Sequence, residues 1–204
     1  MTSATETLPP PPAAAPLDSP ERHLPGDLAI WFFILAEMLA FAVFFASYAF
    51  ARAHNVELFN TYQQTLDRNS GALNTLLLIT GSWFVVLAVR AAHRDDQAAI
   101  SRHLALGFLC GGGFLVVKVM EYAAKFGAGI SLSTNTFYMF YISLTFFHFM
   151  HVILGMVILG VLWVQSRRGV YGAHDAHGLE SGAAYWHMVD LLWIILFPLV
   201  YVMR

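Results

Sequence analysis

Eight polar side chains lie within stretches of sequence that are otherwise apolar. Charged or ionisable groups are costly inside a lipid bilayer, so they usually pair with one another inside a bundle or serve a function. Carboxylates, histidines and a lysine in such surroundings could exchange protons, form ion pairs or bind a metal or haem. The eight candidates are Glu37, Asn74, Lys118, Glu121, His148, His151, His187 and Asp190.

The two histidines of the run Phe147-His148-Phe149-Met150-His151 stand one helical turn apart. That spacing is compatible with one metal or haem, but the other ligands that a metal site needs are missing from the neighbouring sequence. We therefore favour hydrogen-bonded structural histidines and keep ligation as the alternative. Likewise, Lys118 and Glu121 are one turn apart and are expected to neutralise each other, with a relay role as the alternative.

His187 and Asp190 share one face of the last apolar segment, and we interpret them as a polar clamp between helices. Glu37 differs, because the positions one turn away on its own helix are apolar. It must meet a partner on another helix or stay protonated, since burial disfavours the charged form of a carboxyl. We therefore keep a functional interpretation of Glu37 open, in which it handles protons or contacts a partner subunit.

These side chains are positioned by apolar segments of about 20 to 30 residues, long enough to cross a hydrocarbon core of roughly 30 Å. Only 12% of the 204 residues are charged and 58% are apolar, which indicates a membrane protein. Helices are expected, because they satisfy their own backbone hydrogen bonds in lipid. The sequence thus predicts an all-α polytopic bundle of five transmembrane helices, at about 28–51, 72–91, 104–126, 136–165 and 184–203.

The helical domain is predicted to cover residues 27–204, with Asp27 as a possible helix cap. Residues 1–26 contain seven of the eight prolines and are expected to form a disordered cytoplasmic tail. Arginines and lysines slightly favour the N-terminal side of the membrane. We expect a multi-pass membrane protein with its N-terminus in the cytoplasm and its C-terminus on the outer side.

The depths of the polar residues along straight helices predict two layers. An outer layer would contain Asn74, Glu121 and His148, and an inner layer would contain Glu37, His187 and Asp190, with His151 between them. Two packing features are also predicted. Gly107 and Gly111 form a small-residue pair that admits a close neighbour, and Pro198 is expected to bend the last helix.

Five motifs in order resemble subunit III of the haem–copper respiratory oxidases, from about Gly26 to Tyr201. They are Leu35-Ala36-Glu37-Met38-Leu39, Leu73-Asn74-Thr75, Glu121-Tyr122, His148-Phe149-Met150-His151-Val152 with Gly155, and Trp186-His187 with Asp190 and Trp193. Three further runs are most similar to the accessory protein encoded with bacterial nitric oxide reductase: Leu73–Leu77, Glu180–Gly182 and Phe197–Leu199.

This resemblance implies a non-catalytic subunit that supports the assembly, stability or proton supply of a haem-bearing catalytic subunit. The partner would be a cytochrome c oxidase or a nitric oxide reductase, in aerobic electron transport or in denitrification. The resemblance also implies that the chain lies in the bacterial inner membrane. We expect no haem, metal or other cofactor in this chain and leave a bound phospholipid open. Membrane lipids are expected partners, and the formal net charge of −2 gives no reason to expect nucleic acid.

Two other classes of function remain open on the residues alone. A free-standing haem-b or quinone protein would use His148, His151 and His187. A small proton-coupled transporter would use Glu37 together with Lys118 and Glu121.

Overall fold

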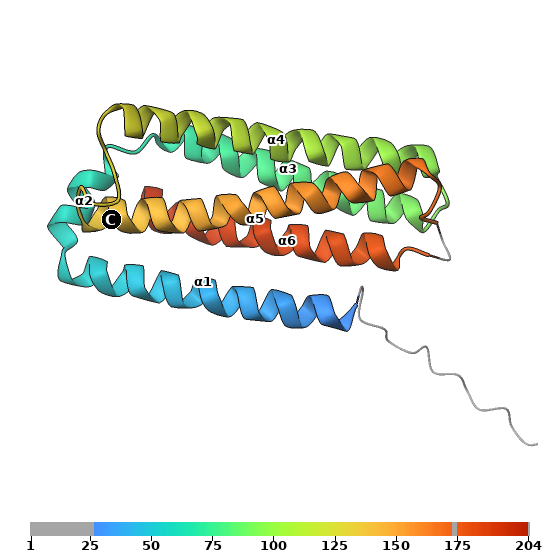
Figure 1. The fold of residues 1–204 in the computed structure, drawn as a ribbon, viewed down its shortest axis with the longest axis horizontal. Helices are drawn as coiled ribbons and strands as arrows, with labels where there is room; N and C mark the ends of the chain where they lie inside the picture. The colour runs from blue at the N-terminus through green and yellow to red at the C-terminus, as the bar shows by residue number, and fades with distance from the viewer. Residues whose placement is uncertain (1–26, 173–174, 204) are drawn as a thin grey trace, which may run out of the picture.

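Helices account for nearly all of the regular structure in the computed structural model, which describes residues 27–172 and 175–203 (Figure 1). The elements are α1 (Leu28–His54), α2 (Val56–Gln63), α3 (Arg68–Ala92), α4 (Gln97–Gly127), α5 (Thr136–Arg167), α6 (His177–Phe197) and the π-helix η1 (Pro198–Val202). Within these residues, five helices are long and apolar enough to cross a membrane, with α6 and η1 counted as one. The predicted all-α bundle of five spanning helices is therefore confirmed, and the predicted tail, residues 1–26, lies outside the described residues.

Short polar side chains fix where four of the long helices begin. Each accepts a hydrogen bond from a backbone N–H of the first turn, which would otherwise lack a partner. These caps are Asp27, Asp67, Asp96 and Asn135, and they precede α1, α3, α4 and α5. The helix starts are thus set by local chemistry and do not depend on hydrophobicity.

Several predicted boundaries were wrong, and two of the displaced starts, those of α3 and α4, coincide with these caps. Helix α3 begins at Arg68 instead of 72, α4 at Gln97 instead of 104, and α6 at His177 instead of 184. The predicted loop 52–71 contains the short helix α2, which buries Phe59 and Gln63 against the end of the bundle. Hydropathy marks the lipid-crossing part of a helix, whereas the backbone continues into polar turns on either side.

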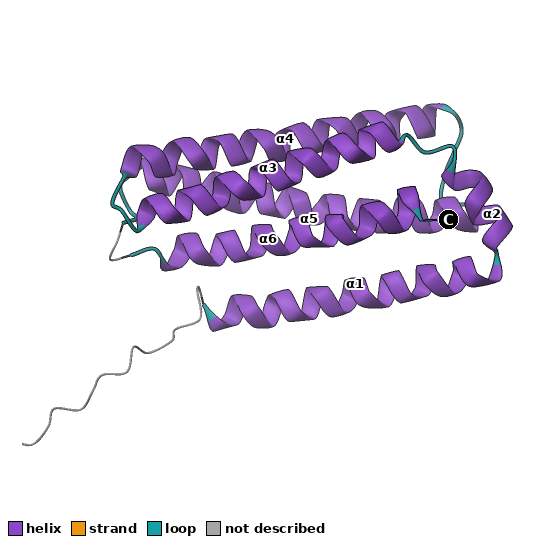
Figure 2. Ribbon diagram, turned by 180° about the vertical axis from the view of Figure 1, so that it is seen from behind, coloured by secondary structure: helices purple, strands orange, loops and turns teal. Residues whose placement is uncertain are grey.

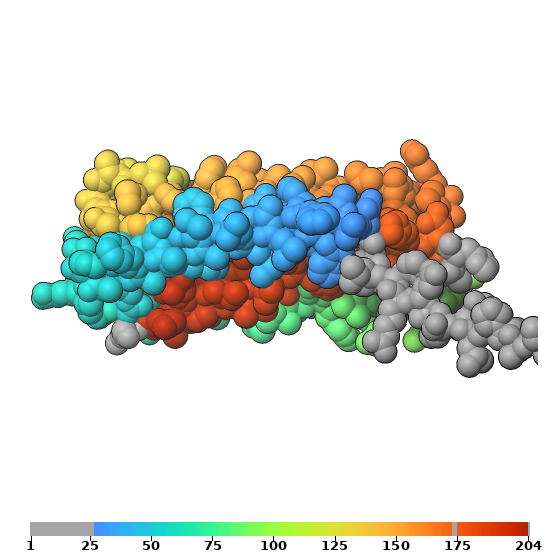
Figure 3. All heavy atoms as spheres, turned by 90° about the horizontal axis from the view of Figure 1, so that it is seen from below, coloured from blue at the N-terminus to red at the C-terminus, as the bar shows by residue number. Residues whose placement is uncertain are grey.

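Helices α3, α4, α5 and α6 form a four-helix core in which each helix packs on the next, and α6 packs back on α3. Helix α1 lies outside this core and packs on α6 and α5 (Figures 1 and 2). Seen from below, it covers the seam between these two helices (Figure 3). The start of α1 and the end of η1 lie at opposite ends of the bundle, as an odd number of crossings requires.

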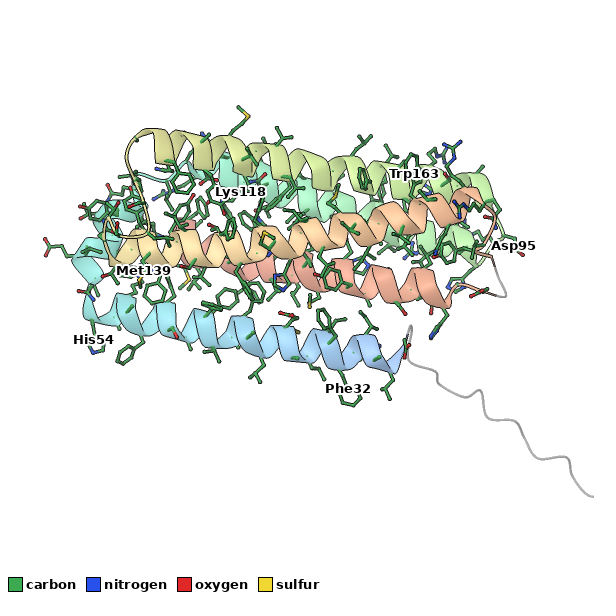
Figure 4. All side chains as sticks on the ribbon, viewed as in Figure 1. Phe32, His54, Asp95, Lys118, Met139 and Trp163 are labelled. Atoms are coloured by element: carbon green, nitrogen blue, oxygen red, sulfur yellow. The ribbon has the colours of Figure 1, made fainter. Side chains whose placement is uncertain are left out.

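Helix α1 is held loosely by comparison with the other helices. Its buried residues are Ile34, Phe41 and Tyr48, spaced two turns apart along one narrow stripe. On the opposite side, Phe32 is 67% exposed and points away from the bundle (Figure 4). A helix with so little buried surface depends on its few specific contacts.

Glycines let the core helices approach closely around one large side chain. The indole of Trp186 on α6 lies against Gly81, Gly111 and Gly155, one from each of the other core helices. A Cβ added at Gly111 would lie 2.6 Å from Trp186 Cη2 and 2.4 Å from Met156 Sδ. At Gly107, the other member of the predicted pair, a Cβ would lie 3.3 Å from Val85. The predicted small-residue pair thus has a close neighbour at each glycine.

The last helix changes its hydrogen bonding where a bend was predicted. The π-helix η1 begins at Pro198, which cannot donate a backbone hydrogen bond. Tyr201 lies within this turn and is fully buried. The π turn thereby directs a tyrosine hydroxyl into the bundle.

Candidate functional site: polar groups inside the bundle

A charged pair lies in the interior of the four-helix core. Lys118 and Glu121 are one turn apart on α4, and Lys118 Nζ lies 3.0 Å from Glu121 Oε2. The lysine is completely buried and its side chain lies beneath α4 in Figure 4. The predicted neutralising pair is therefore present.

Two tyrosines from other elements complete this pair. Tyr141 on α5 donates a hydrogen bond to Glu121 Oε1 at 2.6 Å, and Tyr201 of η1 donates to the same oxygen at 2.8 Å. Lys118 Nζ in turn donates to the Tyr201 hydroxyl at 3.0 Å. We call these four residues the Lys118 cluster. Because each charge has several partners, the cluster offsets part of the cost of removing two ions from water.

Aromatic rings surround the ammonium group as well. Lys118 Nζ lies between 4.9 and 5.6 Å from the ring centres of Tyr122, Tyr141, Trp193 and Tyr201. Ring faces attract cations, most strongly where water is excluded. The sequence reading found the ion pair but missed the tyrosines; Tyr141 could have been found, since it precedes His148 by two helical turns on the same face.

Asn74 and His148, the other predicted members of the outer layer, are also inside the bundle. Both are completely buried, Asn74 on α3 and His148 on α5. His148 packs among the rings of Phe41, Phe114 and Trp193. Glu121, Asn74 and His148, the three predicted outer residues, therefore all lie in the interior of the bundle. Among the described residues, however, neither the side-chain amide of Asn74 nor the ring of His148 has a hydrogen-bond partner.

Glu37 meets its partner across the interface between α1 and α5. Its Oε2 atom lies 3.0 Å from Nε2 of His151, and the other ring nitrogen, Nδ1, lies 2.8 Å from the carbonyl oxygen of Phe147. A carbonyl oxygen only accepts, so Nδ1 carries a proton. Nε2 can then bond to the carboxyl in one of two ways: a protonated Glu37 donates to it, or an imidazolium donates to a carboxylate. In either case the pair holds one shared proton.

His187 and Asp190 are brought to α3 instead. Nδ1 of His187 lies 2.6 Å from the hydroxyl oxygen of Ser82. Asp190, one turn further along α6, is buried. The hydrogen bonds thus divide the predicted inner layer, because Glu37 bonds to His151 whereas His187 bonds to Ser82. The expected clamp between helices exists, but its partner on α3 is a serine that the sequence reading did not select.

A groove with a volume of about 630 Å³ opens beside His187, between α1, α3 and α6. Its walls are mostly apolar and include Trp31, Met38 and Leu191. Polar groups gather at the end nearest the N-terminus of α1, where Nε2 of His93 lies 3.4 Å from Oε1 of Glu180 and Arg90 is adjacent. Sequence periodicity gave no sign of this groove, because it depends on how α1 sits beside the core.

The chemistry available here is hydrogen bonding and proton exchange. Both ring nitrogens of His151 are engaged, so this histidine would have to give up a hydrogen bond to ligate a metal. Among residues 27–172 and 175–203, no group of three or more His, Cys, Asp or Glu side chains is arranged to hold a metal ion.

Comparison with known proteins shows which family this sequence matches. The family model described as "Cytochrome c oxidase subunit III" matches residues 26–204. The chain is 33% identical to cytochrome c oxidase subunit 3 of Thermostichus vulcanus over 177 residues, which is 86% of each chain. It is 31% identical to the protein of that name from Synechocystis, covering 84% of this chain and 72% of the relative. It also resembles "Heme-copper oxidase subunit I+III" of Aeropyrum pernix, with 30% identity over 85% of this chain and 22% of that longer protein.

Proposed function

The chain belongs to the cytochrome c oxidase subunit III family, and we propose from this that it is a non-catalytic membrane subunit of a haem–copper oxidase. The family match carries the proposal, because it extends over residues 26–204 and so includes all five candidate membrane-crossing helices. The implied partner is the haem-bearing catalytic subunit. A relative named "subunit I+III" supports close association, since there the two subunits share one polypeptide.

Within the family, the matched relatives favour a cytochrome c oxidase partner. A nitric oxide reductase partner is the second candidate, favoured by the resemblance of Leu73–Leu77, Glu180–Gly182 and Phe197–Leu199 to the accessory protein of that enzyme. In that case the chain would assist assembly or activation of the reductase during denitrification.

The proposed location is the bacterial inner membrane, with the N-terminus in the cytoplasm. Two observations support this orientation. The start of α1, the loop 93–96 and the described loop residues 168–172 and 175–176 lie at one end of the bundle, and η1 lies at the other. The first end is richer in arginine, with Arg90, Arg94, Arg102, Arg167 and Arg168 near it.

The groove between α1, α3 and α6 suits a phospholipid. Its apolar walls could cover an acyl chain, and Arg90 at its polar end could pair with a phosphate. We include such a lipid in the proposed function as a structural partner that would help to hold the loosely packed α1.

The Glu37–His151 pair supports a role in proton supply. The Glu37 side chain is 22% exposed and the His151 side chain 10% exposed, so the shared proton is near the bundle surface. A partner covering this surface could exchange a proton with the pair, whereas the deeply buried Lys118 cluster is better suited to stability.

Affinity purification of the tagged full-length chain from native membranes in mild detergent tests the proposal. We expect a haem-bearing catalytic subunit to co-purify, identified by mass spectrometry and by its visible spectrum. Oxygen consumption with cytochrome c and consumption of nitric oxide then distinguish the two candidate partners. Recovery of the chain without any haem protein, under conditions in which known oxidases stay intact, would contradict the proposal.

The two other classes of function make different predictions. A free-standing haem protein would keep a Soret absorption band after it is separated from every partner. A proton-coupled transporter would carry flux in proteoliposomes that Glu37→Gln abolishes. Either result would count against the subunit assignment.

A further inference from the structure

One layer of the four-helix core contains a fully buried side chain from each helix. These are Asn74 on α3, Lys118 on α4, His148 on α5 and Trp193 on α6. The ring centres of His148 and Trp193 are 5.2 Å apart, and Lys118 Nζ lies 5.5 Å from the Trp193 ring centre. Three of the four helices thus meet directly at Trp193.

The position of Asn74 in this layer follows from its neighbours on α3. The next residue, Thr75, accepts a hydrogen bond from Nε1 of Trp193 at 3.0 Å. One turn before Asn74, Gly71 faces Phe197 and Tyr201, and Tyr201 is bonded to Lys118. Asn74 is therefore at the level of Trp193 and Lys118, and its complete burial directs it into the core.

Two of these side chains lack the hydrogen bonds that their burial requires. Neither amide atom of Asn74 and neither ring nitrogen of His148 has a partner among the described residues. A polar group buried without a partner costs about 1–3 kcal/mol. Within a bilayer no bulk solvent is available to replace the missing hydrogen bonds. Two such residues in one layer therefore indicate a bound ligand that supplies them.

The hydrogen-bond donors and acceptors of this layer indicate what kind of ligand it binds. Asn74 offers donors and acceptors, a neutral His148 offers one of each, and Lys118 has a donor left beyond its bonds to Glu121 and Tyr201. A ligand that both donates and accepts, carries no charge and is small enough for a closed core meets these demands. Buried water typically makes such bonds to groups that are otherwise unsatisfied.

We propose that Asn74 and His148 form a binding site for ordered water in the core of the bundle. The water extends the hydrogen-bonded network of the Lys118 cluster from α4 and η1 to α3 and α5. All four core helices are then joined through one polar layer, with Trp193 as its apolar wall. This site is independent of which oxidase subunit the chain accompanies.

Water-edited solid-state NMR on the full-length chain in lipid vesicles tests the proposal. The protein carries ¹⁵N-labelled histidine and asparagine, and Asn74→Ser and His148→Gln assign the two signals. Exposed His54 serves as the reference for direct contact with water. For the buried comparison we use His151, whose two ring nitrogens already have protein partners.

We expect magnetisation from water protons to reach the Asn74 amide and the His148 ring as early as it reaches His54. Transfer to His151 should be slower than transfer to these three residues. This early transfer is measured on the wild-type chain, so the test does not require any variant to be stable. If either assignment variant fails to fold, selective ¹³C,¹⁵N labelling of the residue pairs Phe147–His148 and Leu73–Asn74 assigns the same signals. Transfer to both residues no faster than to His151 would overturn the proposal, since the two groups would then be dry.

Discussion

Tyr201, in the π-helix η1, accepts a hydrogen bond of 3.0 Å from Lys118 in the second half of α4. The same hydroxyl donates to Glu121 at 2.8 Å, so it bridges the two members of the ion pair. The π turn that begins at Pro198 places it there. The end of the chain is consequently part of the buried polar network, and changes at either place should affect the same structural unit.

Removing one charge of the Lys118 cluster should be much worse than removing both. Lys118→Met leaves Glu121 as an uncompensated buried carboxylate, and we expect it to lower the free energy of unfolding by about 3–5 kcal/mol. The double variant Lys118→Met/Glu121→Leu should recover a large part of this loss. Titration of the purified chain with SDS in mixed micelles measures both, and additive losses from the two substitutions would show that the residues do not act as a pair.

Alanine should be tolerated very differently at two adjacent glycines. A Cβ at Gly111 would overlap Trp186 and Met156, and at Gly112 it would come no closer than 3.9 Å, to Met156. Overpacking of a filled core typically costs about 1–3 kcal/mol. We therefore expect Gly111→Ala to lower the unfolding free energy by that amount and Gly112→Ala to have little effect or to stabilise. Equal losses from the two variants would mean that the close packing around Trp186 is not what limits substitution.

The partner of Glu37 can be tested with a matched pair of substitutions. Glu37→Gln can still donate a hydrogen bond to Nε2 of His151, so the unfolding free energy should change by less than about 0.6 kcal/mol. Glu37→Leu leaves that nitrogen unpaired and should cost about 1 kcal/mol or more.

Infrared spectroscopy gives an independent readout of the same pair. The wild-type chain should show either a protonated carboxyl band or an imidazolium band from the Glu37–His151 pair, and both variants should lack it. A wild-type spectrum unchanged by Glu37→Gln would argue against the shared proton.

The cap of α3 should make the start of that helix sensitive to acid. The hydroxyl of Ser70, 2.5 Å from Asp67 Oδ2, and the N–H of Asn69 hold the pKa of Asp67 below its ordinary value of 3.8. A carboxyl with a lowered folded-state pKa stabilises fully above its ordinary pKa, and this contribution is lost as the pH falls through the folded-state value.

Asp67→Asn removes that charge but keeps an oxygen that can cap Asn69. We expect amide exchange in the first turn of α3 to be slower in the wild-type chain than in the variant at neutral pH. The difference should shrink as the pH falls below the ordinary pKa of aspartate and disappear once the pH is below the lower folded-state pKa of Asp67. The effect should be small, because Asp67 is almost fully solvated and exposed charges are screened. A difference that persists in strong acid would exclude the charge of Asp67 as its cause.

The sequence by itself determined the number of spanning helices, the ion pair within α4 and the burial of Asn74, Lys118, Glu121 and His148 inside the bundle. Each of these rests on properties of a single helix: its length of apolar residues, its periodicity, and the fact that charges avoid lipid. The same reasoning missed the ends of the helices, because a capped helix continues past its apolar stretch into polar turns, as it does at Asp96.

Only the tertiary structure decided which residues meet. Glu37, His187 and Asp190 were expected in one layer, but Glu37 lies on the outer helix α1 and bonds to His151, whereas His187 faces Ser82 on α3. Depth along a helix can be counted from the sequence, but the rotation of one helix against another is set by packing. Here the glycines around Trp186 allow the core helices to approach closely, and that packing also brings Tyr141 and Tyr201 to Glu121 from distant parts of the chain.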